Sequence, residues 1–100
     1  MQELTAFQRD LLFVLSSLEP TDGTQLKREL ERAKYSSVLS GRLYHNLDIL
    51  VEKSLIRKNT GAGRANEYRL TRPGSAVIRD HHEWQDQYLN DAVNEEMVPQ

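Results

Sequence analysis

The chain has 100 residues, of which 38% are hydrophobic and 28% are charged, and it contains no cysteine. This length is enough for one small domain but hardly for two. No apolar stretch approaches the roughly 20 residues that a membrane-spanning helix requires, and the lack of cysteine excludes disulfides and thiolate zinc sites. The amino end has no basic region followed by an apolar run, so we expect no secretory signal and a cytoplasmic protein without a membrane partner.

The formal net charge of −2 conceals an uneven distribution along the chain. Residues 1–26 sum to −3 and residues 73–100 to −5, whereas residues 27–72 carry eleven basic and five acidic side chains, which gives +6. Such an asymmetry focuses a positive field on one surface, and this bears on the choice of partner more than the total charge does.

The amino-terminal half predicts three helices. Thr5 and Gln8 have the spacing of a capping box, so a first helix should begin near Ala6 and end before the turn at residues 20–23. Thr24 is expected to cap a second, short helix, and Ser40 to cap a third that ends near residues 53–54. The expected inward positions of the third helix are Leu43, Leu47, Leu50 and Val51.

The carboxyl-terminal half predicts a hairpin and one long helix. Residues 55–58 and 67–70 have strand-like composition, and the link between them contains two glycines and should form a loose, basic tip. Thr71 is expected to cap a helix over residues 72–97, and residues 98–100 should fray. The predicted fold class is therefore mainly α with a small β-hairpin (α+β).

This order of elements is that of a winged helix-turn-helix, in which the third helix enters the major groove of DNA and the hairpin forms a wing. Arg42 can donate to guanine or phosphate, and Asn46 can pair with adenine, whereas Asp48 should tilt the carboxyl half of this helix away from the duplex. A solvated helix face carries such residues routinely, but the cations around the wing favour a nucleic-acid partner. The predicted DNA-binding residues are Ser40, Gly41, Arg42, Tyr44, His45, Asn46, Lys58, Arg64 and Arg69.

The last predicted helix would be roughly 39 Å long at about 1.5 Å per residue, so part of it must extend beyond the small body. Its apolar stripe contains a tryptophan and a tyrosine, which we expect to pack on a second subunit. The alternative is that these rings fold back on the first helix of their own chain. The predicted dimer interface consists of Phe7, Leu11, Val77, His81, Trp84, Tyr88 and Leu89.

The sequence favours neither catalysis nor a bound metal. Adjacent histidines such as His81 and His82 point about 100° apart on a helix and cannot share an ion within one subunit. No nucleophile elbow, phosphate loop or pair of acids in a predicted cleft is present. We therefore expect no enzyme, no metal and no cofactor.

Two segments resemble the PadR-like family of transcriptional regulators. Residues 41–56, GRLYHNLDILVEKSLI, resemble the family's recognition-helix signature, and residues 68–74, YRLTRPG, are similar to the junction that closes its wing. The resemblance implies a winged-helix regulator whose first and last helices form the dimer contact. Ser54 departs from the usual glycine and must adopt the helix-end conformation at some cost. With 4 lysines against 9 arginines and acidic flanks, the chain also resembles short haloarchaeal members of the family, including a regulator of the oxidative stress response.

Two functions from different classes follow from these patterns. In the first, residues 1–71 form a winged helix-turn-helix DNA-binding domain, residues 72–97 form a dimerisation helix, and the homodimer regulates transcription from a palindromic operator in double-stranded DNA. In the second, the winged helix is a protein-interaction module of a larger assembly and contacts no DNA. The second gains if Arg42, Lys58 and Arg64 lie on different faces, or if they pair with Glu29, Glu31 or Glu67.

Overall fold

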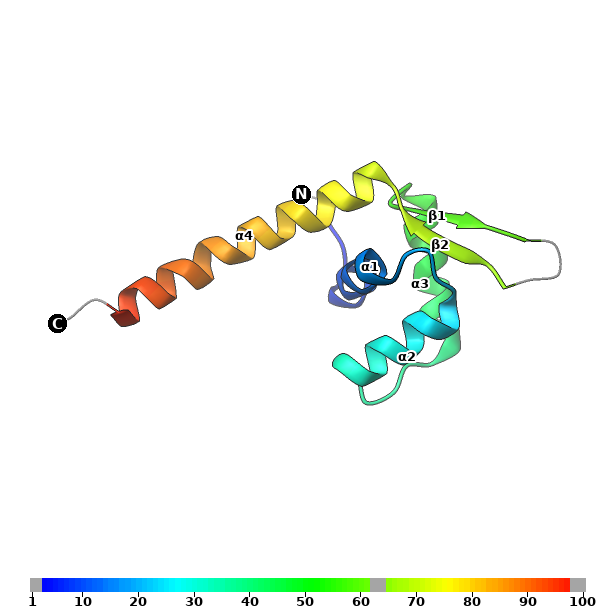
Figure 1. Ribbon diagram of the computed structural model, residues 1–100, viewed down its shortest axis with the longest axis horizontal. Helices are drawn as coiled ribbons and strands as arrows, with labels where there is room; N and C mark the ends of the chain where they lie inside the picture. Colours follow the sequence, from blue (N-terminus) through cyan, green and yellow to red (C-terminus); the bar gives the residue numbers. More distant parts are fainter. Residues whose placement is uncertain (1–2, 62–64, 98–100) are drawn as a thin grey trace.

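The first helix passes through the centre of the fold, and the other elements pack around it (Figure 1). The computed structural model describes residues 3–61 and 65–97, with side chains as far as residue 90. Within these residues the order is α1 (Ala6–Leu18), α2 (Gly23–Ala33), α3 (Ser40–Glu52), β1 (Ile56–Asn59), β2 (Glu67–Leu70) and α4 (Arg72–Met97). The predicted α+β class and order of elements are confirmed.

Helix α1 begins with the predicted capping box. The Thr5 hydroxyl accepts a hydrogen bond from the Gln8 backbone N–H at 3.1 Å, and the Gln8 side-chain carbonyl accepts one from the Thr5 N–H at 3.1 Å. Each bond satisfies a backbone donor that a helix end would otherwise leave without an intrahelical partner. The local sequence therefore accounts for the start of this helix.

The predicted caps of α2 and α3 are wrong. Asp22, not Thr24, caps α2, because its carboxylate accepts a hydrogen bond from the Gln25 N–H at 2.9 Å. Ser40 is already the first residue of α3, and the N-cap position is occupied by Leu39, which makes no side-chain capping bond. Before α2 two neighbouring residues are suitable caps, and sequence alone does not choose between them. Helix α3 begins one residue earlier than predicted and therefore has an N-cap that no capping preference would select.

One hydrophobic core joins the three helices of the body to the hairpin. Burying each large apolar side chain contributes about 1.5–3 kcal/mol before the entropy of ordering the chain is subtracted. On α3 the stripe Leu43, Leu47 and Leu50 is buried as expected. The buried hydrophobic residues are Phe7, Leu11, Leu12, Leu15, Leu26, Leu30, Val38, Leu43, Leu47, Leu50, Leu55, Ile56 and Tyr68.

Helix α3 ends in a left-handed residue, as the sequence predicts for Ser54, whose φ is 62°. The Ser54 N–H donates to the Val51 carbonyl at 2.9 Å, and the Leu55 N–H donates to the Leu50 carbonyl at 3.0 Å. This is a Schellman motif, which turns Leu55 into the core beside Leu50. Strand β1 consequently begins at residue 56, one residue later than predicted.

The hairpin strands pair antiparallel, with Ile56 opposite Leu70 and Asn59 opposite Glu67. On the other edge of β2, Tyr68 exchanges two backbone hydrogen bonds with Thr21, at 2.7 and 3.3 Å. Strand β2 therefore lies between β1 and the turn that precedes α2. This pairing fixes the base of the wing against the helical body.

Helix α4 starts close to the end of α3 and then leaves the body (Figure 1). The Thr71 N–H donates to the Leu55 carbonyl at 3.1 Å, and the Thr71 hydroxyl donates to the Ser54 carbonyl at 2.6 Å. The same hydroxyl accepts from the Gly74 N–H at 3.1 Å, which confirms Thr71 as the cap. A Cβ on Gly74 would lie 2.0 Å from the Leu55 carbonyl oxygen, so only glycine fits there. The molecule measures 64 × 29 × 20 Å because α4 projects so far.

Candidate nucleic-acid interface

Helix α3 lies between α2 and the hairpin (Figure 1). The residues at its amino-terminal end form an exposed edge of the body. Leu39 is 76% exposed, and the predicted residues Ser40, Gly41, Arg42 and His45 are also exposed. The buried stripe of α3 faces the core, so these residues occupy the opposite side and the tip of the helix. The structure thus brings together most of the predicted residues of the recognition helix.

Arg42 rests on an aromatic surface made by Phe7 of α1 and by Tyr35. Its guanidinium carbon lies 3.9 Å from the centroid of the Phe7 ring and 5.7 Å from that of Tyr35. The two rings meet edge to face at 5.4 Å, and the Tyr35 hydroxyl donates to the Asp10 carboxylate at 2.6 Å. Burial, and then the hydrogen bond to Asp10, raise the pKa of Tyr35. Stacking of this kind restricts the rotamers of Arg42 while leaving its N–H groups able to donate.

Asn46 connects two helices of the body. Its amide nitrogen donates to the Arg42 carbonyl at 2.8 Å, and its amide oxygen accepts from the Gln8 side chain at 3.0 Å. Gln8 is only 7% exposed, so the contact anchors α3 to the start of α1. One N–H and one lone pair of the amide remain. The structure thus gives Asn46 a packing role. The remaining N–H and lone pair are the donor and acceptor that pairing with adenine needs, so that pairing stays a prediction.

Tyr44 also has a packing role. A Cβ on Gly23 would lie 2.5 Å from the Tyr44 hydroxyl oxygen, so the ring occupies the space that any other residue at position 23 would need. The side chain nevertheless remains 41% exposed. Tyr44 therefore joins α3 to the start of α2 and still presents part of its ring at the surface.

The hairpin separates the predicted wing cations. Arg57 lies directly opposite Arg69, and Lys58 opposite the buried Tyr68, so the two arginines share one face and Lys58 lies on the other. The Lys58 ammonium is 3.8 Å from the Asp48 carboxylate of α3. Asp48, which was expected to tilt the carboxyl half of α3 away from the duplex, thus contacts a cation of the hairpin. Arg64, a further predicted contact, lies outside the described residues.

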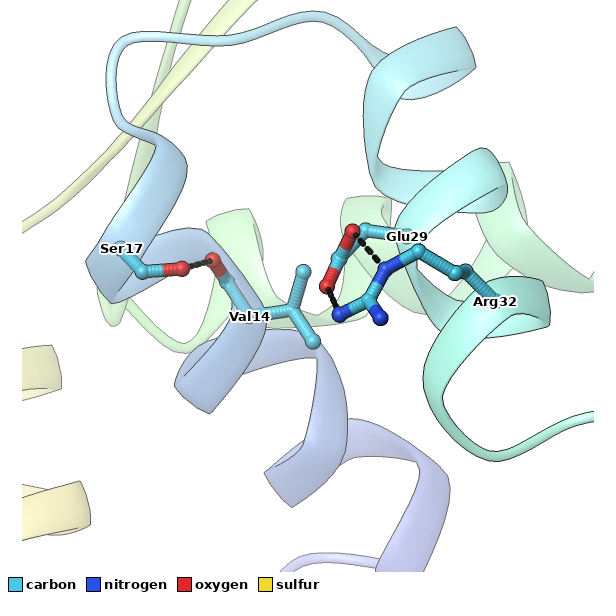
Figure 2. A network of polar contacts seen from close by, with 4 residues as sticks. All are labelled: Val14, Ser17, Glu29 and Arg32. Atoms are coloured by element: carbon cyan, nitrogen blue, oxygen red, sulfur yellow. Dashed lines mark hydrogen bonds and ion pairs between the residues drawn. The ribbon is translucent and has the colours of Figure 1, made fainter.

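The two glutamates of α2 that could have neutralised Arg42 pair with other groups. Glu29 pairs with Arg32 through two contacts. Figure 2 shows this pair, and it also shows the hydrogen bond that the Ser17 hydroxyl donates to the Val14 carbonyl. The hydrogen bond from Arg32 lowers the pKa of Glu29. Glu31 accepts from the Val38 N–H at 2.9 Å and pairs with Lys27 at 3.2 Å, and these contacts, in that order, lower its pKa. Among the described residues, Arg42 makes no ion pair.

The predicted dimer residues fall into two groups. Phe7 and Leu11 are at most 3% exposed within a single protomer, so their side chains have no surface for a partner, and we correct the expectation for both. Val77 packs half-buried against the core, and His81 is 8% exposed. Burial first, and then the charge of Arg9, lower the pKa of His81. The spacing of apolar residues along the first and last helices does not show which of them are buried in the protomer and which remain exposed to a partner.

Three predicted residues of α4 remain at the surface beyond the body. Trp84, Tyr88 and Leu89 are 45%, 61% and 62% exposed. The Trp84 ring lies 5.7 Å from His81 and 5.2 Å from Tyr88, so the rings form a row along the helix. The aromatic side chains therefore do not fold back to bury themselves on α1.

The part of the chain with described side chains contains no group of three or more His, Asp or Glu residues that could hold a metal ion. In the same part, no helix is both long enough and apolar enough to cross a membrane. His82 pairs instead with Asp86, at 3.3 Å, one turn along α4.

Sequence reasoning missed one feature of the edge, the exposed Leu39. The available signal was a run of two apolar residues, Val38 and Leu39, immediately before the helix, of which only Val38 is buried. A leucine at an N-cap contributes no capping bond, which sets this residue apart from the caps of α1 and α2.

Comparison with known proteins agrees with this geometry. The model of the transcriptional regulator PadR-like family matches residues 11–80. RosR of H. salinarum, solved from crystals grown from NaBr, is 37% identical, and the alignment covers 95% of this chain and 94% of RosR with a TM-score of 0.79. The complex structure of hsRosR-S4 is also 37% identical, with 95% and 90% coverage and a TM-score of 0.78. No curated protein matches the chain.

A more distant structure shares the fold alone. FabT of Streptococcus pneumoniae, solved in complex with DNA, is 16% identical over 92% of this chain and 62% of FabT, with a TM-score of 0.74. The match to RosR bears out the resemblance to short haloarchaeal members. Because the family model covers more than half of the sequence, the chain belongs to the PadR-like family of transcriptional regulators.

Proposed function

We propose that the protein is a homodimeric DNA-binding transcriptional regulator of the cytoplasm that inserts the amino-terminal end of α3 into the major groove of a palindromic operator. The observation that carries this proposal is Arg42, which is exposed, held on an aromatic surface and free of any ion pair among the described residues. An arginine ordered in this way loses little rotamer entropy when it donates to a guanine edge. RosR and the family model support the assignment.

The rest of the edge supports binding to a duplex. Ser40, Gly41 and His45 are exposed around Arg42, and Arg69 lies exposed with Arg57 on one face of the wing. Phosphate contacts from such cations position the protein, whereas contacts to base edges carry the sequence preference. Pairing of Arg42 with Glu29 or Glu31 would have favoured the competing role as a protein-interaction module, but both glutamates pair with cations of α2. The separation of Lys58 from the arginines of the wing counts in favour of that competing role.

Dimerisation has separate support on α4. The exposed aromatic and aliphatic side chains Trp84, Tyr88 and Leu89 lie beyond the body, where a second copy could cover them. A two-fold pair of this kind presents two recognition helices to two half-sites, which is the common arrangement of helix-turn-helix regulators. Sedimentation of a Trp84→Glu variant should show a monomer, and a variant that stays dimeric would contradict this interface.

The DNA-binding role is tested by selecting bound duplexes from a random pool and measuring affinity for the recovered sequence. We expect a palindromic motif and an affinity that falls steeply with rising salt. Arg42→Ala should cost about 1–3 kcal/mol of discrimination at one base position in each half-site. Arg79→Ala is a matched control, since it removes the same charge from an exposed position on α4. Recovery of no motif, or binding that ignores salt, would contradict the proposal.

A further inference from the structure

We propose that Leu39 contacts the C5 methyl group of a thymine in the major groove, and that Gly41 lets the duplex approach closely enough for this contact. The proposal rests on the proposed function and deepens it, because it names a base feature that the protein recognises. It is carried by two residues that the packing of the protomer does not explain.

Leu39 stands where the fold alone would favour a polar residue. It is the N-cap of α3, a position at which serine, threonine, aspartate or asparagine would bind a free backbone N–H, and its side chain makes no capping bond. It is also 76% exposed, more than any other large hydrophobic residue described. The residue therefore offers the helix neither a cap nor burial.

The backbone on both sides holds Leu39 outward. Val38 is buried to 2% exposure, and its N–H donates to the Glu31 carboxylate at 2.9 Å. The Leu39 carbonyl accepts from the Leu43 N–H at 3.0 Å, which is the first hydrogen bond of α3. Because Val38 and the Leu39 carbonyl are both anchored, the fold keeps the Leu39 side chain at the surface.

Gly41 differs from the other described helical glycines. A Cβ added to Gly23 would lie 2.5 Å from the Tyr44 hydroxyl oxygen, and one added to Gly74 would lie 2.0 Å from the Leu55 carbonyl oxygen. A Cβ added to Gly41 would meet no atom within 4 Å. Glycine is unfavourable inside a helix, and the protomer gives no steric reason for it here. Open space beside a missing side chain is what the close approach of a second molecule requires.

The chemistry of the groove identifies the apolar partner. On the major-groove edges of the base pairs, the C5 methyl of thymine is the apolar group, and the other groups are hydrogen-bond donors and acceptors. Residues at the amino-terminal end of a recognition helix are the ones that contact base edges. The free energy of burying one such group, about 0.8 kcal/mol, corresponds to about a fourfold change in affinity.

The test combines Leu39→Ala with replacement of single thymines by deoxyuridine, which removes only the C5 methyl group. With the duplex recovered by selection, we expect one thymine in each half-site whose replacement weakens the wild-type protein about fourfold. Leu39→Ala removes the contact from both subunits of the proposed dimer, so it should weaken binding to the thymine duplex about fourfold for each half-site. Replacing the thymines should then cause no further loss in this variant. Fluorescence anisotropy measures all four affinities.

Further variants keep the result independent of folding. Leu39→Ser should raise the thermal midpoint by supplying a cap and still weaken binding, while Gly41→Ala should raise the midpoint and weaken binding roughly tenfold by overpacking the contact. Full affinity of Leu39→Ala, or an unchanged effect of deoxyuridine in that variant, would overturn the methyl contact alone. A wild-type protein that selects no duplex would overturn the proposed function and this contact together.

Discussion

Helices α1 and α3 both have 13 residues and share one core, yet their amino-terminal ends are built in opposite ways. Helix α1 has a complete capping box, with both hydrogen bonds at 3.1 Å. Helix α3 has a leucine without a capping bond and, two residues later, a glycine that no neighbour requires. The end that obeys the local rules holds the body together, and the end that departs from them is the one we assign to DNA. Departures of this kind are expected where function outweighs stability.

The largest expected effect is on the free energy of unfolding, and it distinguishes Gly74, which the fold requires, from Gly41, which it does not. Gly74→Ala places a methyl group 2.0 Å from the Leu55 carbonyl oxygen and should lower the free energy of unfolding by about 3 kcal/mol. Gly41→Ala adds the same group to open space and should raise that free energy by up to about 1 kcal/mol. Urea denaturation followed by circular dichroism compares the two, and changes of the same sign would contradict the distinction.

The cap of α1 should matter for stability alone. Thr5→Ala removes the hydroxyl that accepts from the Gln8 N–H and should lower the free energy of unfolding by about 1 kcal/mol. Thr24→Ala is the control, because Asp22 caps α2 and Thr24 is exposed. A change above about 0.5 kcal/mol in the control would contradict the observed cap of α2. An altered base preference in Thr5→Ala would contradict the assignment of the α1 cap to stability alone.

Ser54 tests whether every departure from a local rule marks a DNA contact. Its φ of 62° is unfavourable for any residue with a Cβ, and its position at the end of α3 has a structural explanation in the Schellman motif. Ser54→Gly should raise the free energy of unfolding by about 0.5 kcal/mol, since relief of strain exceeds the added entropy of the unfolded chain. Ser54→Ala keeps the strain and should gain nothing. A changed operator preference in Ser54→Gly would show that this departure is functional too.

The smallest expected effect is a dependence of the stability on pH that comes from His81 of α4. Burial and Arg9 lower the pKa of His81 in the folded protein, so the unfolded chain binds the proton more readily. Stability should be complete above the ordinary histidine pKa of about 6.5 and fall as the pH drops through it. The pKa values of Glu29 and Glu31 lie below the ordinary glutamate pKa of 4.5, so these two groups lower the stability only at more acidic pH. The range from about pH 7 to about pH 5.5 is therefore left to histidine. His81→Phe should flatten the curve there, and an unchanged slope would contradict the assignment.

Sequence reasoning succeeded where the determinants are local. The capping box at Thr5, the Thr71 cap and the left-handed Ser54 each depend on residues a few positions apart, and all three are present. The order of elements follows from periodicity in the same way, since each amphipathic stripe lies within one segment.

Apart from the local caps of α2 and α3, the features that the sequence did not show arise where distant segments meet. The helical wheel placed Asn46 at the margin of the exposed face but could not show that Gln8, 38 residues away, would bind its amide oxygen. Phe7 was assigned to the dimer, and the structure instead uses its ring to support Arg42. The exposure of Leu39 depends on the anchoring of Val38 by Glu31, which is again a tertiary contact. Packing across the core decides these roles, and one sequence does not reveal it.

The root of α4 has a mechanical consequence for the proposed dimer. Thr71 bonds to the carbonyls of Ser54 and Leu55, the residues that end the recognition helix, and Gly74 lies against the same turn. The end of α3 and the start of α4 are thus joined by hydrogen bonds and close packing. Helix α4 therefore works as a lever, because a small change of angle at this joint moves its far end by a larger distance. For a lever roughly 39 Å long, a tilt of about 5° at the joint moves the far end by about 3 Å. The spacing of half-sites that a pair of these chains can bridge is therefore decided at this joint as much as where the two subunits touch.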